Sequence, residues 1–235
     1  MNQWHIAVLI PARDEEELLP RCLLSLERAR ALLPSDVTSD VIVVSDSSTD
    51  QTYQIAKKML ADRGCAMTGR YGCVGTARIA AAEIALRRSQ VPLHQCWLAN
   101  TDADCEVPAA WLLDQVRMGQ RGIAAVAGTI DVDSFEEHQP RVRDLFRTTY
   151  LIHADGTHPH VHGANLGIRA DAYKEAGGWA RLQTAEDHDL WSRLGVSGCN
   201  RVSDARLRVL TSGRRVGRAP LGFAGALAAH NEVTV

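Results

Sequence analysis

Two aspartates one residue apart, Asp102 and Asp104, follow a short apolar run and have side chains that can bind a divalent cation. Residues 97–99 predict a buried strand, and Pro108 is expected in the first turn of the next helix. The carboxylates would then lie at the carboxyl end of a strand, where open α/β sheets bind ligands. Mg²⁺ and Mn²⁺ prefer such oxygen ligands and often share them with a phosphate. Taken alone, the motif is equally consistent with a solvated turn.

A second acidic pair, Glu186 and Asp187, opens a predicted helix for which Thr184 is the expected N-cap. Capping and the helix dipole can explain acids in a first turn. The same position also suits a general base that removes a proton from a substrate hydroxyl. Both interpretations stay open from the residues alone.

The first predicted strand is followed by a rigid turn and a cation. Residues 5–10 are almost continuously apolar, which is typical of a strand in a parallel sheet covered on both faces. Pro11, Ala12 and Arg13 come next and could hold a nucleotide. The acids at 14–17 can also be explained as the first turn of a helix that extends to about residue 33.

Asp46 stands one residue past the second predicted strand, which covers residues 40–45. Ser48 or Thr49 is the expected cap of the following helix, and Asp46 precedes both. Its carboxylate is therefore predicted to be free to accept hydrogen bonds from a base or a ribose.

Glycines and an arginine mark the next predicted helix. Gly72 and Gly75 are expected at its N-terminus, which suits phosphate binding, although Gly-x-x-Gly is common and no Walker lysine follows. Arg78 lies one turn into this helix. It could reach an anion, but its spacing favours a surface salt bridge.

Two features have no fixed role. Four histidines within residues 153–162 form a cluster that can bind metal, yet no carboxylate or cysteine at a recognisable spacing joins them. The tail carries a basic patch at 214–218 and an apolar segment at 220–229. These could cover phosphates, lie on an anionic membrane surface or form a plain amphipathic helix, and the helix is favoured for the apolar part.

The elements that position these residues alternate between strands and helices, so an α/β fold with a mainly parallel sheet and right-handed connections is expected. No linker, repeat or low-complexity segment divides the chain, which predicts a single domain over residues 1–235. Further strands are predicted at residues 123–130, 163–169 and 201–210, and further helices at 76–88, 142–152 and 170–175.

The composition is that of an ordinary globular protein, with 235 residues, 46% hydrophobic and 23% charged. A formal net charge of −2 gives no reason to expect nucleic-acid binding. The six cysteines are scattered without a zinc-binding pattern, which indicates a reducing compartment such as the cytoplasm. No signal peptide is expected, and the longest apolar run, near residues 221–229, is far shorter than the roughly 18 residues of a membrane span.

In this order the motifs resemble those of family 2 glycosyltransferases with the GT-A fold. The resemblance covers about residues 6–215 and is specific only when the motifs are taken together. Ser45 and Ser47 replace an aspartate and a glycine of the family pattern, and Ile79 stands where asparagine is common. The segments that carry the resemblance are residues 8–16, 41–52, 75–78, 100–104 and 185–190.

The resemblance implies a Rossmann-like GT-A fold with a mixed, mainly parallel sheet flanked by helices. It implies a nucleotide-binding half at about residues 1–105, an acceptor half at about 106–210 and a tail at 211–235. The implied reaction is metal-dependent transfer of a sugar from a UDP- or GDP-sugar to an acceptor hydroxyl, with inversion. The acceptor is expected to be lipid-linked or a small molecule, and the third metal ligand is left open.

The scattered cysteines and the lack of a predicted membrane span favour a cytoplasmic enzyme, with peripheral contact at the inner face of the membrane as an open alternative. The resemblance also implies roles for individual residues. The nucleotide would be bound by Pro11, Ala12, Arg13, Glu15, Asp46, Arg78 and Asp102. Asp104 and Asp102 would bind Mn²⁺ or Mg²⁺, Asp187 with Glu186 beside it would take the acceptor proton, and Arg214 and Arg215 would contact the diphosphate.

Two rivals to this hypothesis stay open. Metal-dependent phosphoryl or nucleotidyl transfer also uses acid pairs at strand ends. A sugar-nucleotidyltransferase is expected to carry a glycine-rich loop directly after the first strand, where this chain has residues 11–14. A haloacid-dehalogenase-like phosphatase is expected to carry Asp-x-Asp on the first strand, whereas this chain has that motif at Asp102 and Asp104. A catalytically inactive nucleotide-sugar-binding protein is favoured by Ser45 and Ser47 and disfavoured by the intact Asp104 and Asp187.

Overall fold

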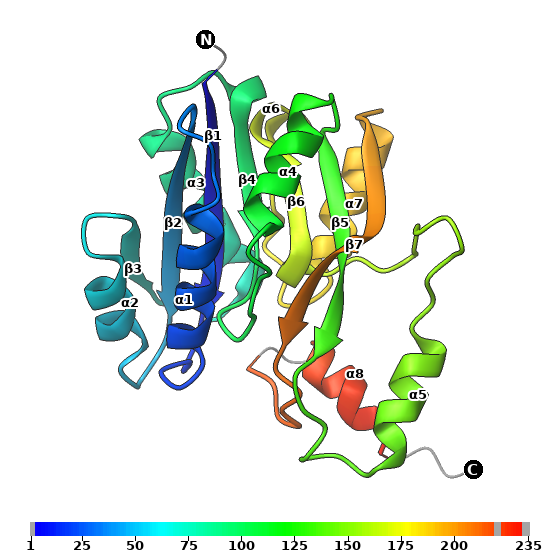
Figure 1. The fold of residues 1–235 in the computed structure, drawn as a ribbon. Helices are drawn as coiled ribbons and strands as arrows, with labels where there is room; N and C mark the ends of the chain where they lie inside the picture. Colours follow the sequence, from blue (N-terminus) through cyan, green and yellow to red (C-terminus); the bar gives the residue numbers. More distant parts are fainter. Residues whose placement is uncertain (1–2, 219–221, 232–235) are drawn as a thin grey trace.

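The computed structural model describes residues 3–218 and 222–231, which are built around a seven-stranded sheet (Figure 1). The strands are β1 Trp4–Ala12, β2 Val37–Asp46, β3 Cys65–Gly69, β4 Cys96–Asn100, β5 Ala125–Val132, β6 Leu166–Arg169 and β7 Arg201–Thr211. The helices are α1 Leu19–Arg30, α2 Thr52–Leu60, α3 Val74–Arg88, α4 Trp111–Gln120, α5 Arg141–Thr149, α6 Ala170–Glu175, α7 Glu186–Val196 and α8 Phe223–Ala229. Two 3₁₀ turns, η1 Leu93–Gln95 and η2 Gly163–Asn165, precede β4 and β6.

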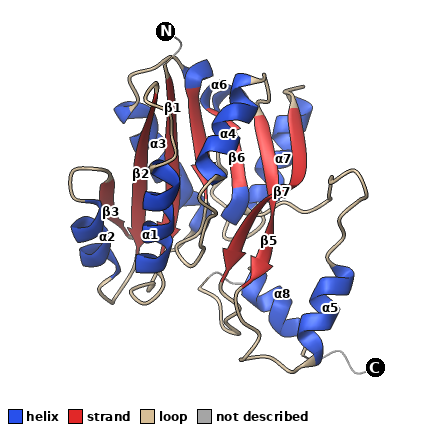
Figure 2. Ribbon diagram, viewed as in Figure 1, coloured by secondary structure: helices blue, strands red, loops and turns tan. Residues whose placement is uncertain are grey.

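The sheet is mixed and mainly parallel, in the order β3-β2-β1-β4-β6-β5-β7. β6 runs antiparallel to both of its neighbours, β4 and β5, and every other pairing in the described sheet is parallel. The carboxyl ends of β1, β2 and β4 therefore open toward the same edge. The predicted α/β class is confirmed, and Figure 2 shows the helices arranged around the strands.

Two apolar layers cover the sheet, one on each face. α1, α2 and α4 pack in one layer, where Trp111 is buried, and α3, α6 and α7 pack in the other, where Leu190 is buried. Neighbouring residues of β1 enter opposite layers, Val8 the first and Leu9 the second. This explains why the strand is continuously apolar, because successive side chains point to opposite faces and both faces are covered.

A smaller apolar cluster joins α5 and α8 beyond the ends of β5 and β7 (Figure 1). Leu227 of α8 and Phe146 of α5 both belong to this cluster, and the ring centroids of Phe146 and Phe223 lie 6.0 Å apart. α8 confirms the helix favoured for the apolar tail, but its residues Phe223–Ala229 include no polar side chain, so an amphipathic pattern is not formed within it; positions 219–221 of that segment lie outside the described residues. No helix in the described ranges combines the length and the apolar character needed to span a membrane.

The starts of α4 and α7 differ from the prediction. Residues 108–110 form a turn in which the Trp111 N–H donates to the Pro108 carbonyl, so the proline precedes the helix. Thr184 is not the cap of α7, because Ala185 holds the N-cap position with a left-handed φ of 57°. The prediction was wrong at both places because the chain enters each helix through a turn set by the surrounding fold.

The region from β2 to β3 also differs from the prediction. The Asp50 carboxylate, and not the hydroxyl of Ser48 or Thr49, accepts the N–H of Thr52 at the start of α2. β3 was not predicted. It lies at the edge of the sheet and is only partly buried, so it lacks the apolar run that identifies the inner strands.

Candidate active site

A pocket of about 500 Å³ opens at the carboxyl ends of β1, β2, β4 and β7. The starts of α3 and α7 and the residues of α8 complete its walls. Arg215 does not line the pocket, since its side chain is exposed and its backbone N–H donates to Glu137. The other residues selected from the sequence all line it: Pro11, Ala12, Arg13, Glu15, Asp46, Arg78, Asp102, Asp104, Glu186, Asp187 and Arg214.

Asp102 and Asp104 lie together directly after β4. Their carboxylate oxygens and the Cys105 sulfur lie within 4.8 Å of one another. Burial raises the pKa of Asp104 to about 7 against the opposing charge of Arg214, and the Asp102 charge adds to the rise. Two adjacent carboxylates, of which Asp104 is costly to ionise, are a suitable ligand pair for a hard divalent cation that would offset their charge, so the residues fit Mg²⁺ or Mn²⁺.

Arg214 connects the segment after β7 with the loop after β1. Its guanidinium donates two hydrogen bonds to the Glu15 carboxylate, at 2.9 and 2.7 Å, and lies 2.9 Å from Asp104 Oδ2. Burial acts to lower the pKa of Arg214, but the bond to Glu15 and the Asp104 charge outweigh it and raise the pKa. Arg214 is therefore a fixed cation in the pocket, and Glu15 positions it.

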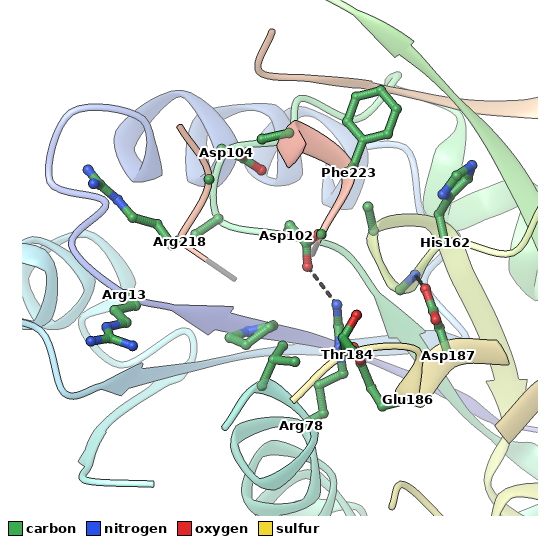
Figure 3. Close-up of a pocket in the computed structure, with 18 of the residues that line it drawn as sticks. Arg13, Arg78, Asp102, Asp104, His162, Thr184, Glu186, Asp187, Arg218 and Phe223 are labelled. Carbon is green, nitrogen blue, oxygen red and sulfur yellow. Dashed lines mark hydrogen bonds and ion pairs between the residues drawn. The ribbon is translucent and has the colours of Figure 1, made fainter. Parts of the chain in front are cut away.

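Arg78 is buried, and the surface salt bridge that its spacing favours is wrong. Its Nη2 donates to Asp102 Oδ1 at 2.6 Å, and its Nε donates to Glu186 Oε1 at 3.2 Å (Figure 3). The guanidinium also lies 5.2 Å from the centroid of the Trp179 ring. Arg78 thus ties the loop that follows β4 to the start of α7.

Glu186 and Asp187 have different surroundings although they are adjacent. Glu186 is buried and paired with Arg78, and burial raises the pKa of its carboxyl. Asp187 accepts two backbone N–H groups at 2.8 Å, that of Gly163 on Oδ2 and that of His188 on Oδ1. Each oxygen keeps an acceptor position. Asp187 is therefore oriented by the backbone and available to a ligand, whereas Glu186 is engaged by Arg78.

The two sides of the pocket carry different residues (Figure 3). Arg13 and Arg218 lie on one side, Asp187 and His162 lie on the other, and Asp102 lies between them. The cationic side suits a negatively charged group. The opposite side carries the carboxylate that is oriented to accept a proton.

The backbone N–H groups of Gly72, Cys73 and Gly75, around the start of α3, already have partners within the chain. Those of Gly72 and Cys73 donate to the Asp46 carboxylate, and that of Gly75 donates to a carbonyl of the loop at 180–182. A Cβ at position 75 would lie 2.1 Å from another carbonyl oxygen of that loop. The glycines therefore serve a turn and a close approach, and the predicted phosphate site is not formed by these amides. Asp46 is likewise not free of protein partners.

The histidine cluster mainly holds its own loop in place. His158 and His160 each donate from Nε2 to a backbone carbonyl oxygen, at 3.1 and 3.0 Å. His162 lies in the pocket wall with its Nε2 2.9 Å from the Tyr150 hydroxyl, and burial lowers its pKa to about 4. Within residues 3–218 and 222–231, the side chains spaced to hold a metal ion are Asp102, Asp104 and Cys105, without a histidine.

Arg218 and Phe223 line the pocket but were not selected from the sequence as site residues. Arg218 lines the pocket and donates from Nε to the Asp14 carbonyl. Phe223 begins α8, and its ring centroid lies 6.2 Å from that of His162. The basic patch and the apolar tail were visible in the sequence, but no spacing signal placed them beside the strand ends.

Comparison with protein families gives a match over most of the chain. Residues 7–177 match the model described as Glycosyl transferase family 2. The chain belongs to this family. The resemblance inferred from the motifs is thereby confirmed, and the Asp-x-Asp group that it includes is formed by Asp102 and Asp104. A search of curated proteins finds no match to this family 2 chain.

Solved glycosyltransferase structures share the GT-A fold of this family 2 protein. S. aureus TarS 1-349 in complex with UDP-GlcNAc has a TM-score of 0.68 at 15% identity, over 93% of this chain and 61% of that chain. Mannosyltransferase PcManGT from Pyrobaculum calidifontis, in complex with GDP-Man and Mn²⁺, has a TM-score of 0.65 at 18% identity, over 97% and 69%. GalNAc-T7 with UDP, GalNAc and Mn²⁺ has a TM-score of 0.66 at 15% identity, over 91% and 44%. The chain thus spans about three fifths of the TarS 1-349 structure.

Proposed function

We propose that this protein transfers a sugar from a UDP- or GDP-sugar to an acceptor hydroxyl with inversion, using Mn²⁺ or Mg²⁺. The observation that supports the proposal is that Asp102 and Asp104 share one pocket with the backbone-oriented carboxylate of Asp187 (Figure 3). Family 2 membership supports the reaction class. The titles of the similar structures name UDP-GlcNAc and GDP-Man, which supports a nucleotide-sugar donor.

The donor side would stabilise the departing nucleoside diphosphate. A cation held by Asp102 and Asp104 would neutralise the negative charge that develops on the diphosphate. Arg214 and Arg218 add positive charge from the segment after β7, and Arg13 adds it from the turn after β1. A set of fixed cations lowers the barrier because it needs no reorganisation as the charge develops.

The acceptor side would supply the base. Asp187 takes the proton of the acceptor hydroxyl. The hydroxyl oxygen attacks the anomeric carbon of the sugar, and the bond from that carbon to the diphosphate breaks. Attack from the face opposite the leaving group inverts the configuration. Glu186 acts through Arg78, which holds Asp102 on the donor side, so Glu186 is assigned as a positioning residue.

The predicted division of the chain remains a proposal. The nucleotide half at about residues 1–105 would supply Arg13, Asp46 and Asp102, and the acceptor half at about 106–210 would supply His162 and Asp187. The tail at 211–235 would serve both halves. A lipid-linked or small acceptor, peripheral membrane contact and a cytoplasmic location are proposed with it, and the six free cysteines support a reducing compartment.

Titration calorimetry of UDP and GDP, with and without Mn²⁺, tests the proposal. At least one nucleotide should bind to the wild type in a manner that depends on Mn²⁺, and Asp104→Ala should abolish that dependence. Asp114→Ala is the matched control, because Asp114 is an acid on α4 that lies outside the pocket and has a side chain 47% exposed. Failure of both nucleotides to bind to folded wild-type protein would overturn the proposal.

A further inference from the structure

The two candidate metal ligands, Asp102 and Asp104, each have one carboxylate oxygen paired with an arginine. Asp102 Oδ1 accepts a hydrogen bond from Arg78 at 2.6 Å, and Asp104 Oδ2 lies 2.9 Å from Arg214 Nη2. The Asp102 side chain is still 38% exposed, whereas that of Asp104 is 12% exposed. Asp104 is therefore the carboxylate whose access depends on the arginine beside it.

The Asp104 carboxylate has little room for a cation away from Arg214. Its Oδ1 accepts a hydrogen bond from the thiol of Cys105, a buried residue, at 3.7 Å, and its Oδ2 is paired with Arg214. Mg²⁺ binds a carboxylate oxygen at about 2.1 Å, so a cation on Oδ2 would lie at most about 5 Å from Arg214 Nη2. Charges of the same sign repel strongly at that separation in a partly buried site.

Glu15 holds Arg214 beside Asp104. The Arg214 guanidinium donates two hydrogen bonds to the Glu15 carboxylate, and the Glu15 side chain is 6% exposed. The Glu15 N–H in turn donates to Thr52 Oγ1 at 2.8 Å, which ties this loop to the start of α2. A bidentate pair fixes the orientation of the guanidinium. A cation that approaches Asp104 therefore meets the positive charge of Arg214 in place.

A nucleoside diphosphate carries the negative charge that would remove this repulsion. Phosphate oxygens bind divalent cations and also accept hydrogen bonds from a guanidinium. A diphosphate beside both would offset the charge of the cation and that of Arg214. The cation and the nucleotide would then each favour the binding of the other, and linkage requires the same effect in both directions.

We propose that Arg214 holds free divalent cations off Asp104 and admits the cation together with the nucleoside diphosphate. The inference rests on the proposed function, because the nucleotide is that of the sugar donor. It gives Arg214 a role beyond that of a diphosphate contact, since its charge makes the two ligands depend on one another. Arg214 thereby determines the form in which the metal enters the pocket.

Electron paramagnetic resonance of free Mn²⁺ measures how tightly the protein binds the ion alone. Without nucleotide, Arg214→Met should bind Mn²⁺ at least about 10-fold more tightly than wild type, within the roughly 5–150-fold range of coupling between two sites. Arg208→Met is the matched control, because Arg208 lies on β7 with a side chain 52% exposed and does not line the pocket. It makes the same change in net charge and should keep the wild-type Mn²⁺ affinity.

Calorimetric titration of UDP and GDP, with and without Mn²⁺, measures the coupling itself. For the nucleotide that binds to wild type, Mn²⁺ should tighten binding by about 100-fold, and Arg214→Met should lower this factor at least about 10-fold. Arg214→Lys keeps the positive charge and should keep the weak wild-type binding of Mn²⁺ alone. This variant separates the effect of the charge from that of the shape of the side chain.

The outcomes separate this inference from the proposed function. If Arg214→Met binds Mn²⁺ alone no more tightly than wild type, while nucleotide binding to wild type depends on Mn²⁺, the inference is overturned and the proposed glycosyltransferase is left intact. No binding of either nucleotide to wild type would overturn both. If circular dichroism shows that Arg214→Met does not fold, Arg214→Gln replaces it, since glutamine is neutral and can still donate to Glu15. Equal Mn²⁺ affinities of Arg214→Gln and wild type would then overturn the inference.

Discussion

Replacement of Arg78 by methionine should destabilise the protein, because Arg78 is the counter-ion of a buried carboxylate. Methionine keeps an apolar chain of similar length but removes the charge. The Arg78 side chain is 2% exposed and that of its partner Glu186 is 8% exposed, whereas that of Asp102 is 38% exposed. The variant would therefore leave one buried carboxylate, that of Glu186, without a positive partner.

The size of the effect follows from these burials. Removal of one partner from a buried ion pair costs about 3–5 kcal/mol. Asp102 is partly solvated and adds little, so the lower end, about 3 kcal/mol, applies. For a chain of 235 residues this corresponds to a fall in melting temperature of about 6–12 °C.

The cost should also depend on pH. Burial raises the pKa of Glu186 and Arg78 opposes this rise, so without Arg78 the carboxyl binds a proton more readily. A carboxyl whose pKa is raised in the folded state lowers the stability of the fold when the pH is above that pKa. The penalty becomes smaller as the pH falls through the raised pKa, because the carboxyl is then protonated. The difference in unfolding free energy between wild type and variant should therefore be larger at pH 8 than at pH 5.

Urea denaturation at both pH values measures the effect. Arg78→Met combined with Glu186→Gln should recover part of the loss, since a neutral amide needs no counter-ion. Arg87→Met on the same helix is the control, because the Arg87 side chain is 68% exposed and should contribute under about 0.5 kcal/mol. A loss below about 1 kcal/mol at pH 8, or a double variant no more stable than the single one, would refute the reasoning.

Three further predictions concern the base, the pocket histidine and the helix contact. Asp187→Asn should slow nucleotide release from the sugar donor by about 10²–10⁴-fold with nucleotide affinity unchanged, and a loss no greater than that of Glu186→Gln would contradict its role as the base. Because the pKa of His162 is lowered to about 4, wild type should lose up to about 3 kcal/mol as the pH falls from 6.5 to 4. In denaturant titrations, His162→Gln should lose less unfolding free energy than wild type between pH 6.5 and 4. Parallel curves of stability against pH for the two proteins would contradict this prediction. Gly75→Ala should destabilise by about 1–3 kcal/mol, because its Cβ would lie 2.1 Å from a carbonyl oxygen. Gly225→Ala, which has open space around it, should melt no lower than wild type, and equal shifts for the two variants would disprove the steric argument.

The inner strands could be predicted because each is an unbroken apolar run followed by polar residues. β1, β2 and β4 are buried on both faces, and that environment selects such runs. β3 could not be predicted in the same way, because an edge strand is partly exposed and does not need them. Helix starts were less predictable than strands, since Ala185 and Asp50 take positions that depend on neighbouring loops.

The sequence by itself determined which acids stand at strand and helix ends, because those positions depend on neighbours along the chain. Asp102 and Asp104 after β4, and Asp187 at the start of α7, could be recognised in this way. Only the tertiary structure decided which charges pair. Arg78 meets Glu186 108 residues away, and Arg214 reaches a partner 199 residues away. Such pairs form only after the sheet brings the ends of distant strands to one edge, and burial there then decides which carboxylates are engaged and which can still bind a ligand.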